Sequence, residues 1–295
     1  MADPRPMTLL CITTYEKGQE FMRECKRLGW RVVLVTAEKL RNADWPRESL
    51  DDTFYLPNEI PVSDIVKAVT HLARTTKLDR IVALDEYDME TAATLREHLR
   101  IPGMGLTTMR YFRDKLAMRI RALDRRIRVP DFVPVVNHDD IRYYLEHVPG
   151  PWVLKPRQEA SAIGIKKIQA ADELWPLLDQ LGDKQSSFLL EKFVPGEVYH
   201  VDSVVSEGEV VFANVSKYGK PPMNVAQGGG VFTTFTVPRG SEDDAGLRQI
   251  NRDLIAALGL VRGVAHAEFI KAHADGHFYF LECAARVGAV RIYGR

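Results

Sequence analysis

The chain has 295 residues, of which 45% are hydrophobic and 27% charged, a composition typical of a folded globular protein and not of a disordered one. Its 40 basic and 40 acidic residues cancel, so the overall charge gives no electrostatic reason to expect a nucleic-acid or membrane-surface partner. This length accommodates two or three packed units, and any anion that the protein binds must be held by local groups.

The three cysteines, Cys11, Cys25 and Cys283, lack the spacing of a zinc site or of a disulfide framework. We interpret them as buried small hydrophobic residues in a reducing compartment. The first residues do not resemble a signal peptide, and no run reaches the roughly 18 apolar residues that a membrane-spanning helix needs. The expected location is therefore the cytoplasm.

Residues 1–105 alternate between short β-branched runs and helical stretches. The runs Thr8–Thr14 and Arg31–Thr36 flank a helical stretch, Gln19–Leu28, which predicts a βαβ unit, and the alternation continues to Pro102. This pattern predicts a small doubly wound α/β domain. No dinucleotide-binding glycine fingerprint follows its first strand.

Two acidic residues, Asp85 and Glu86, end a predicted strand of this domain, where open α/β sheets place ligand groups. Acidic strand ends are also common outside binding sites, so both interpretations stay open. The stretch Ile101–Gly105 is the predicted boundary, because proline and glycine extend neither neighbouring element.

A basic helix and a strand–loop–strand follow this boundary. The helix opens with Arg113–Arg119, which by itself is compatible with a solvated helix face. Lys155 lies in Trp152–Arg157, a strand stopped by proline, and a loop leads from it to a second strand at Ile163–Ile168. A lysine before such a loop can place an ammonium group and backbone N–H groups on phosphate oxygens.

A further strand and a hairpin are predicted after residue 187. The strand Phe188–Glu197 ends in a Pro-Gly turn, which by itself is a common structural arrangement, and Tyr199–Val205 then pairs with Glu209–Val215. Lys217–Gly230 has no periodicity and predicts a loop, either a connector or a lid over a substrate. A helix capped at its start by Ser241 runs to Leu258.

The stretch Gly263–Gly288 predicts a β-hairpin that brings two carboxylates together. Its runs flank Ala274–Gly276, a three-residue loop with glycine where a left-handed conformation is required. This turn places Glu268 opposite Glu282, and like charges so placed destabilise a hairpin by roughly 0.2–1 kcal/mol. A divalent cation would offset the repulsion. The alternative is a solvated strand face on which a bulge separates the carboxylates.

Period-2 alternation divides the side chains of this hairpin between two faces. The buried face is predicted to hold Ala267, Phe269, Leu281 and Cys283, and the other face His266, Glu268, Phe280 and Glu282.

Five short motifs follow one another from about Gly103 to Gly288: R-D-K at Arg113–Lys115, L-K-P at Leu154–Pro156, E-K-F-V-P-G-E at Glu191–Glu197, H-A-E-F at His266–Phe269 and E-C-A-A-R-x-G at Glu282–Gly288. Together they resemble the ATP-grasp superfamily, in particular its carbamoyl-phosphate-synthase and biotin-carboxylase branch. The resemblance implies an α/β fold with an N-terminal Rossmann-like domain at residues 1–105. A two-lobed ATP-grasp fold with antiparallel sheets would follow, with a lid subdomain at 106–187 and a C-terminal subdomain at 188–295.

This resemblance implies binding of ATP with Mg²⁺, with Mn²⁺ as an alternative metal. Lys115 and Lys155 would neutralise the nucleotide phosphates, and Lys155 would also act in catalysis. Glu268 and Glu282 would hold the metal through oxygen ligands, which Mg²⁺ prefers. Arg286 would steady the transferring phosphoryl group or the acyl intermediate, a role that suits a guanidinium fork, or else form a structural salt bridge.

The resemblance also assigns residues around the rest of the nucleotide. Glu191, Lys192 and Val194 match the hinge whose main-chain groups meet the adenine edge, and Glu197 matches the position that holds the ribose hydroxyls. Many relatives carry several glycines after the lysine of the strand–loop–strand, whereas Gln158–Ala162 holds none. Ser161 is therefore the candidate to supply a hydroxyl in place of a close backbone.

The implied reaction is ATP-dependent activation of a small-molecule carboxylate as an acyl phosphate, which an amine attacks to form a C–N bond. Ala284 stands where many relatives have a metal-binding asparagine, so a second Mg²⁺ would be held loosely or through water. Full relatives usually continue further after the position of Gly288, so an incomplete active site is one expectation. The alternatives are a nucleotide-binding module without turnover and a carboxylase-like activity on bicarbonate. A homodimer is compatible with the resemblance.

Overall fold

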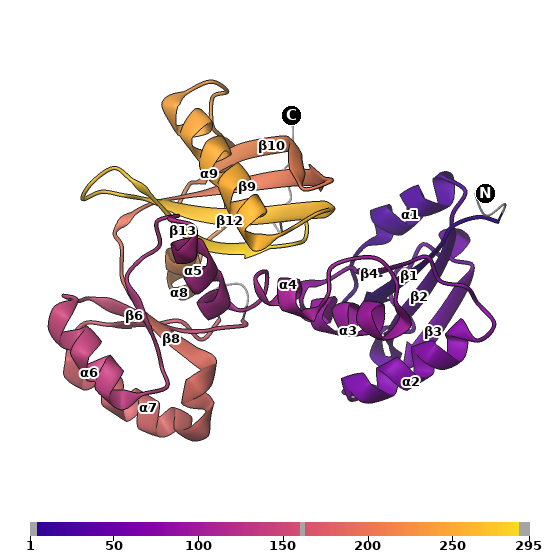
Figure 1. Cartoon of the computed structure of the whole chain (residues 1–295), viewed down its shortest axis with the longest axis horizontal. Helices are drawn as coiled ribbons and strands as arrows, with labels where there is room; N and C mark the ends of the chain where they lie inside the picture. Colours follow the sequence, from indigo (N-terminus) through magenta and orange to yellow (C-terminus); the bar gives the residue numbers. More distant parts are fainter. Residues whose placement is uncertain (1–4, 160–162, 289–295) are drawn as a thin grey trace. The chain divides into compact units, whose positions relative to one another are not determined.

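The structure is a computed structural model that describes residues 5–159 and 163–288. The chain divides into two compact units, Met1–Met109 and Arg110–Arg295 (Figure 1). Ser161 and the end of the chain after Gly288 lie outside the described residues. The subdomain limits at residues 105 and 187 stay predictions.

The first unit is a four-stranded parallel sheet with helices on both faces. Its strand order is β3-β2-β1-β4, with β1 at Thr8–Thr13, β2 at Arg31–Ala37, β3 at Asp52–Leu56 and β4 at Arg80–Ala83. Helix α1 (Gln19–Arg27) packs on one face, and α2 (Val62–Ala73) and α3 (Met89–Leu99) pack on the other. Short 3-10 helices lie at Glu38–Leu40, Arg47–Ser49 and Glu86–Asp88. The predicted doubly wound arrangement is confirmed.

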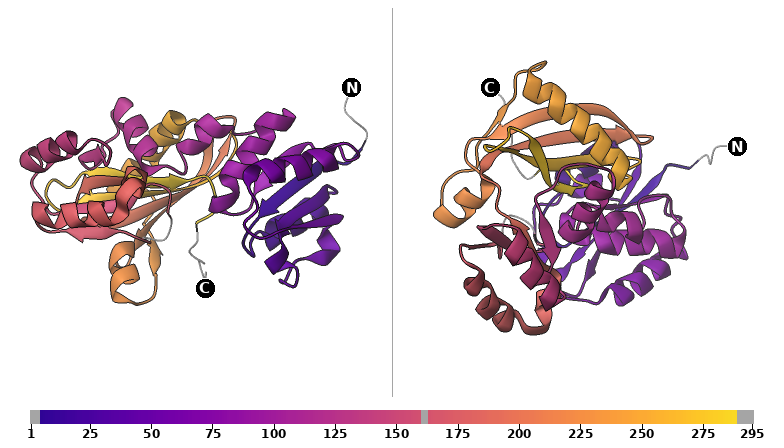
Figure 2. Two further views of the ribbon diagram at one scale, coloured as in Figure 1. Left: turned by 90° about the horizontal axis from the view of Figure 1, so that it is seen from below. Right: turned by 60° about the vertical axis from the view of Figure 1, so that its left-hand side comes forward.

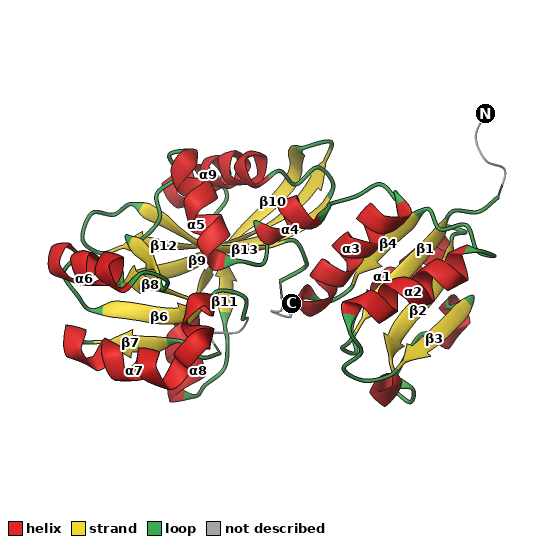
Figure 3. Cartoon of the chain, turned by 60° about the horizontal axis from the view of Figure 1, so that its bottom comes forward, coloured by secondary structure: helices red, strands yellow, loops and turns green. Residues whose placement is uncertain are grey.

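The second unit contains a four-stranded antiparallel sheet covered by two helices. Its order is β5-β8-β6-β7, with β5 at Phe132–Pro134, β6 at Trp152–Pro156, β7 at Lys166–Ile168 and β8 at Phe188–Lys192. Helices α6 (His138–His147) and α7 (Leu174–Leu181) lie beside these strands (Figure 3) and share a core with them. Short 3-10 helices at Ala171–Glu173 and Gly182–Ser187 flank α7.

A five-stranded antiparallel sheet forms the rest of the second unit. Its order is β11-β10-β9-β12-β13, with β9 at Gly196–Ser206, β10 at Glu209–Tyr218, β11 at Thr234–Thr236, β12 at Gly263–Ala272 and β13 at Phe278–Ala284. Helix α9 (Glu242–Leu258) lies along this sheet (Figure 2), and α5 (Lys115–Asp124) packs beside α9 and β13. A short helix, α4 (Leu106–Arg110), spans the boundary between the units. None of the described helices is long and apolar enough to span a membrane.

The hairpin of β12 and β13 pairs Glu268 with Glu282 as predicted, but its turn is longer than predicted: Ala272 pairs with His277, so the turn comprises His273–Gly276, and a bulge follows. Gly276 has φ +70°, and Glu268 lies opposite Glu282. The register shifts at the next position, where Phe269 faces Phe280 instead of Leu281. Such an extra residue turns the side chains beyond it to the other face. The face predicted for Phe280 and Leu281 is therefore wrong: Phe280 is fully buried and Leu281 is half-buried.

The stretch Lys217–Gly230 is only partly a loop. Strand β10 continues through Tyr218, because β11 pairs with its last residues, and helix α8 occupies Pro222–Gly228. Proline at the first helical position is favourable, because its fixed φ suits a helix and its missing N–H has no intrahelical partner to lose. The prediction of a loop without secondary structure is wrong for these residues.

Candidate functional site

A cavity of about 800 Å³ lies within the second unit and is lined by residues of both its sheets. This volume lies in the range of small-molecule sites, about 300–1,000 Å³. Its polar lining includes Lys115, Lys155, Glu191, Lys192, His266, Glu268, Glu282 and Arg286. Pro221–Met223 and Gly230–Phe232, on either side of the main part of α8, also line it.

Lys115 is positioned by the residues next to it. The side chain of Asp114 caps α5 by accepting hydrogen bonds from the N–H groups of Leu116 and Ala117, and it pairs with Arg157, the residue that follows β6. The ammonium of Lys115 donates to the Glu159 carbonyl at 2.6 Å and lies 2.9 Å from Glu282 Oε2. Lys115 is therefore fixed at the cavity wall by main chain and carboxylate together.

A buried cluster of two cations and one carboxylate lies at the cavity, with Lys155 and Glu191 in its lining. Lys155 on β6 is ion-paired with Glu191 on β8, and the guanidinium of Arg119 lies 3.0 Å from the second oxygen of Glu191. Burial lowers the pKa of Lys155, with Arg119 adding to the effect and Glu191 opposing it. Burial raises the pKa of Glu191, but the two cations outweigh burial and lower it. The cluster keeps a net positive charge, which suits an anionic ligand.

No role was predicted for Arg119 from the sequence, but its side chain is fully buried. Its guanidinium also donates to the carbonyl of Leu281 at the bulge, and it lies over the ring of Phe280 at 5.6 Å. Arg119 follows Lys115 by one helical turn, so both side chains lie on one face of α5. The four-residue spacing of Lys115 and Arg119 was the only sign in the sequence that both side chains act together. Basic residues at this spacing are equally compatible with a helix face exposed to solvent.

The two hairpin carboxylates face the cavity from adjacent strands. Burial would raise the pKa of Glu282, but Lys115 and Lys155 outweigh it and lower the pKa to about 2. Glu268 Oε1 accepts a hydrogen bond from the Tyr218 hydroxyl at 2.7 Å and lies 3.4 Å from His266 Nε2. A pair of carboxylates on one cavity wall fits Mg²⁺, which takes one or two carboxylates together with phosphate oxygens.

Only some of the residues predicted for the adenine and ribose side line the cavity. Lys192 and Val194 line the cavity, and the main-chain N–H of Lys192 donates to Asp131 at 2.8 Å. Glu197 is not among the cavity residues: it alternates with Val198, which faces the cavity, and its carboxylate lies 2.5 Å from Lys217 Nζ. Arg286 lines the cavity and donates to the carbonyl of Val287 at 3.0 Å.

Comparison with known proteins bears on this arrangement. Residues 148–293 match the ATP-grasp domain family. This part of the chain is an ATP-grasp domain. The family predicted from the motifs is therefore confirmed, while the roles predicted for individual site residues stay predictions.

Individual ATP-grasp relatives are similar over most of this chain. An L-arginine-specific L-amino acid ligase of Bacillus subtilis is 26% identical over 247 residues, which are 80% of this chain and 58% of the relative. The chain thus spans less than two thirds of that relative's length.

Two solved structures share the fold. An L-amino acid ligase from Bacillus licheniformis matches with a TM-score of 0.79 and 21% identity over 97% of this chain and 68% of the other. An N5-carboxyaminoimidazole synthetase from Staphylococcus aureus, solved with ADP, matches with a TM-score of 0.73 and 18% identity over 96% and 71% of the two chains. Similarity at these identities shows the fold, and the predicted α/β class with antiparallel ATP-grasp sheets is confirmed.

Proposed function

We propose that the chain is a ligase that uses Mg-ATP to activate a small-molecule carboxylate as an acyl phosphate for attack by an amine. The observation that carries the proposal is the convergence of Lys115, Lys155, Glu268, Glu282 and Arg286 on one cavity. The relatives named as L-amino acid ligases support amino acids as the two substrates.

The phosphate side of the nucleotide is proposed to lie against Lys115 and Lys155. The ammonium of Lys155 is held in place, because it is buried and ion-paired with Glu191, whose second oxygen is paired with Arg119. Preorganised cations of this kind stabilise charge that develops during phosphoryl transfer, without reorganising at the moment of reaction. Glu191 acts here through its side chain, as a positioning residue for Lys155.

Glu268 and Glu282 would hold Mg²⁺, with Mn²⁺ as an alternative metal of similar ligand preference. The bound metal would supply neutralisation of phosphate charge. On nucleotide binding, Lys115 would exchange part of its contact with Glu282 for phosphate oxygens. The same lysine thereby keeps the metal-binding carboxylate neutralised while no ligand is present.

The proposed reaction has two steps. An oxygen of the substrate carboxylate attacks the γ-phosphorus of ATP, the bond to the ADP oxygen breaks, and an acyl phosphate forms. The amine nitrogen then attacks the carbonyl carbon, inorganic phosphate leaves with the electrons of the broken C–O bond, and the nitrogen loses a proton. Arg286, just after β13 in the cavity lining, is proposed to bind the transferring phosphoryl group through its guanidinium fork.

Release of ADP tests this function. The purified chain is mixed with Mg-ATP, pairs of amino acids and, separately, hydroxylamine, which traps an acyl phosphate as a hydroxamate. We expect ADP and hydroxamate to form in proportion when the right acid is present. Nucleotide binding without ADP release would indicate a binding module without turnover. ADP release that needs bicarbonate and no amino acid would instead indicate a carboxylase-like reaction.

A further inference from the structure

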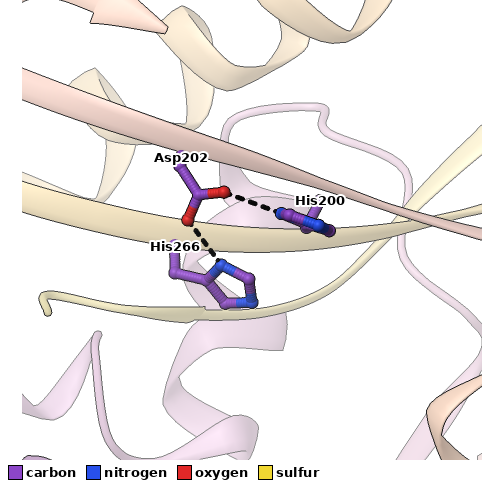
Figure 4. A group of neighbouring side chains, drawn as sticks. All are labelled: His200, Asp202 and His266. Carbon is purple, nitrogen blue, oxygen red and sulfur yellow. Dashed lines mark hydrogen bonds and ion pairs between the residues drawn. The ribbon is translucent and has the colours of Figure 1, made fainter. Parts of the chain in front are cut away.

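A cluster of two histidines and one aspartate lies beside the hairpin carboxylates. His200 and Asp202 alternate on β9 and so share a face, and His266 on β12 lies directly opposite Asp202. Asp202 Oδ2 is 2.8 Å from His200 Nδ1, and Asp202 Oδ1 is 2.8 Å from His266 Nδ1. Figure 4 shows the two rings on either side of this single carboxylate.

The outer nitrogen of each ring has an oxygen partner. His200 Nε2 is 2.7 Å from Thr234 Oγ1, and that hydroxyl donates its own proton to the carbonyl of Lys217. His266 Nε2 faces Glu268 Oε1 at 3.4 Å. The inner nitrogen of each ring, Nδ1, therefore faces one oxygen of the Asp202 carboxylate.

The cluster is compact and largely shielded from water. The ring centroids of His200 and His266 lie 5.0 Å apart, and the two residues are only 1% and 7% exposed. A single divalent ion at this place can take one nitrogen of each ring and the carboxylate as its ligands.

We propose that His200, Asp202 and His266 form a binding site for a divalent transition-metal ion of the Zn²⁺ class, separate from the Glu268–Glu282 pair. The candidate ligand atoms all lie within 4.8 Å of one another. Ligands of one metal at about 2.0–2.2 Å lie roughly 3–3.5 Å apart in tetrahedral geometry, so small side-chain rotations suffice. Two imidazoles with one carboxylate suit Zn²⁺, Co²⁺ or Ni²⁺, whereas Mg²⁺ prefers oxygen ligands alone.

The surroundings have two features of a metal centre. Thr234 and Glu268 orient the two rings through Nε2, as outer partners of metal-bound histidines do. The main chain of Gly288 passes close by: a Cβ there would lie 2.8 Å from His266 Nδ1 and 3.0 Å from Asp202 Oδ1. Glycine thus keeps open the space beside the ligand atoms. The side chain of Asp202 is 30% exposed, which leaves a path for the ion and a position for water.

Titration of the chelator-treated full chain with Co²⁺, in the presence of millimolar Mg²⁺, tests the site. We expect one equivalent to bind with the visible absorption of Co²⁺ coordinated by nitrogen ligands. His200→Ala should weaken binding more than about 100-fold, beyond the roughly 10–100-fold cost of losing an outer partner that we expect for Thr234→Val. Gly288→Ala should also weaken it, by filling the open space.

Two control variants locate the ion. His273→Ala removes an exposed histidine of the hairpin turn and should leave the affinity unchanged, and so should Glu282→Gln, which alters the carboxylate pair. Equal losses of Co²⁺ affinity in His273→Ala and His200→Ala would show that the ion binds to histidines in general and would overturn the proposal. If His200→Ala keeps Co²⁺ binding and Glu282→Gln loses it, the ion lies at the carboxylates, and the proposal is also overturned. If the variants do not fold, the Co²⁺ titration of the unmodified chain is the test. Failure of that chain to bind one equivalent of Co²⁺ overturns the proposal. The proposal stands or falls independently of the ligase function.

Discussion

The ammonium of Lys115 lies 2.9 Å from the carboxylate of Glu282, so a residue proposed to bind phosphate neutralises a residue proposed to bind metal. The repulsion between Glu268 and Glu282 is thereby offset without any ion. This pairing changes what removal of one carboxylate does to the protein.

Glu282→Gln should lower the stability of the ligand-free protein and abolish hydroxamate formation. Repulsion alone would make the substitution neutral or stabilising, but the loss of the Lys115 ion pair reverses the sign. Because the Glu282 side chain is 36% exposed, we expect a loss of only about 1 kcal/mol. Thermal unfolding and hydroxamate yield are the two measurements. Glu146→Gln, on the exposed face of α6, is the matched control and should change neither. A stable Glu282→Gln protein with normal turnover would contradict the assigned role.

Lys155→Met should remove most of the stabilisation that Mg-ATP gives. A ligand that binds only the folded state stabilises it by about 2.7 kcal/mol at 100 times its Kd, which appears as a rise in melting temperature. Lys155→Met keeps the length of the side chain and removes the charge next to Glu191. Lys184→Met removes an exposed lysine, so its shift with Mg-ATP should equal that of the unmodified protein. Equal shifts in the two variants would mean that Lys155 does not contact the nucleotide.

The sequence predicted that Glu268 lies opposite Glu282, but it did not predict the register that brings them together. Next to the turn, Lys271 pairs with Phe278, one position away from the predicted register, and the bulge at Leu281 restores the predicted pair. The bulge at Leu281 was not predictable, since a run of apolar residues reads equally well with either face buried. The bulge depends on a partner from elsewhere, as Arg119 bonds the Leu281 carbonyl across 162 positions.

Contacts between distant segments account for the remaining differences. His200 and Asp202 have the spacing of side chains on one strand face, but their approach to His266 depends on pairing between β9 and β12, which no turn connects directly. Glu191 was predicted to act at the nucleotide hinge through main-chain groups, whereas its side chain is ion-paired with Lys155 and Arg119. Sequence motifs identify such residues without showing which of their atoms are used.

An ion pair in the first unit should make stability depend on pH. The Arg5 guanidinium donates two hydrogen bonds of 2.8 Å to Asp79, and the Thr8 N–H donates another; together they lower the pKa of Asp79 despite burial. A lowered carboxyl pKa stabilises the folded state above the unfolded pKa of about 3.9, and this contribution is lost as the pH falls below it.

Arg5→Gln should therefore cost about 0.5–1 kcal/mol at pH 7, and the difference from the unmodified protein should shrink below about pH 4. Unfolding followed at several pH values measures both. Lys67→Gln, which breaks an exposed pair with Asp64, should have little effect at any pH. A cost that stays constant down to pH 3 would assign the role of Arg5 to packing.

Arg119→Met should be the most destabilising of these substitutions. Arg119 is fully buried and contacts both Glu191 and the Leu281 carbonyl, so methionine removes the cation and leaves that carbonyl without its donor. Breaking a buried ion pair by removing one partner costs about 3–5 kcal/mol. Because Glu191 keeps its ion pair with Lys155, we expect a loss of stability at the lower end of this range, about 3 kcal/mol. Arg119→Lys keeps the charge but cannot bond both acceptors with a rigid fork, so it should recover only part of this loss.

Denaturant unfolding of the two variants beside Arg125→Met, at an exposed position after the same helix, measures the cost. The positioning role adds a second expectation: the Arg119→Lys protein, if folded, should bind Mg-ATP more weakly, because Glu191 and Lys155 lose their fixed geometry. Unchanged nucleotide affinity in a destabilised Arg119→Lys protein would limit Arg119 to folding and leave the orientation of Lys155 to Glu191 alone.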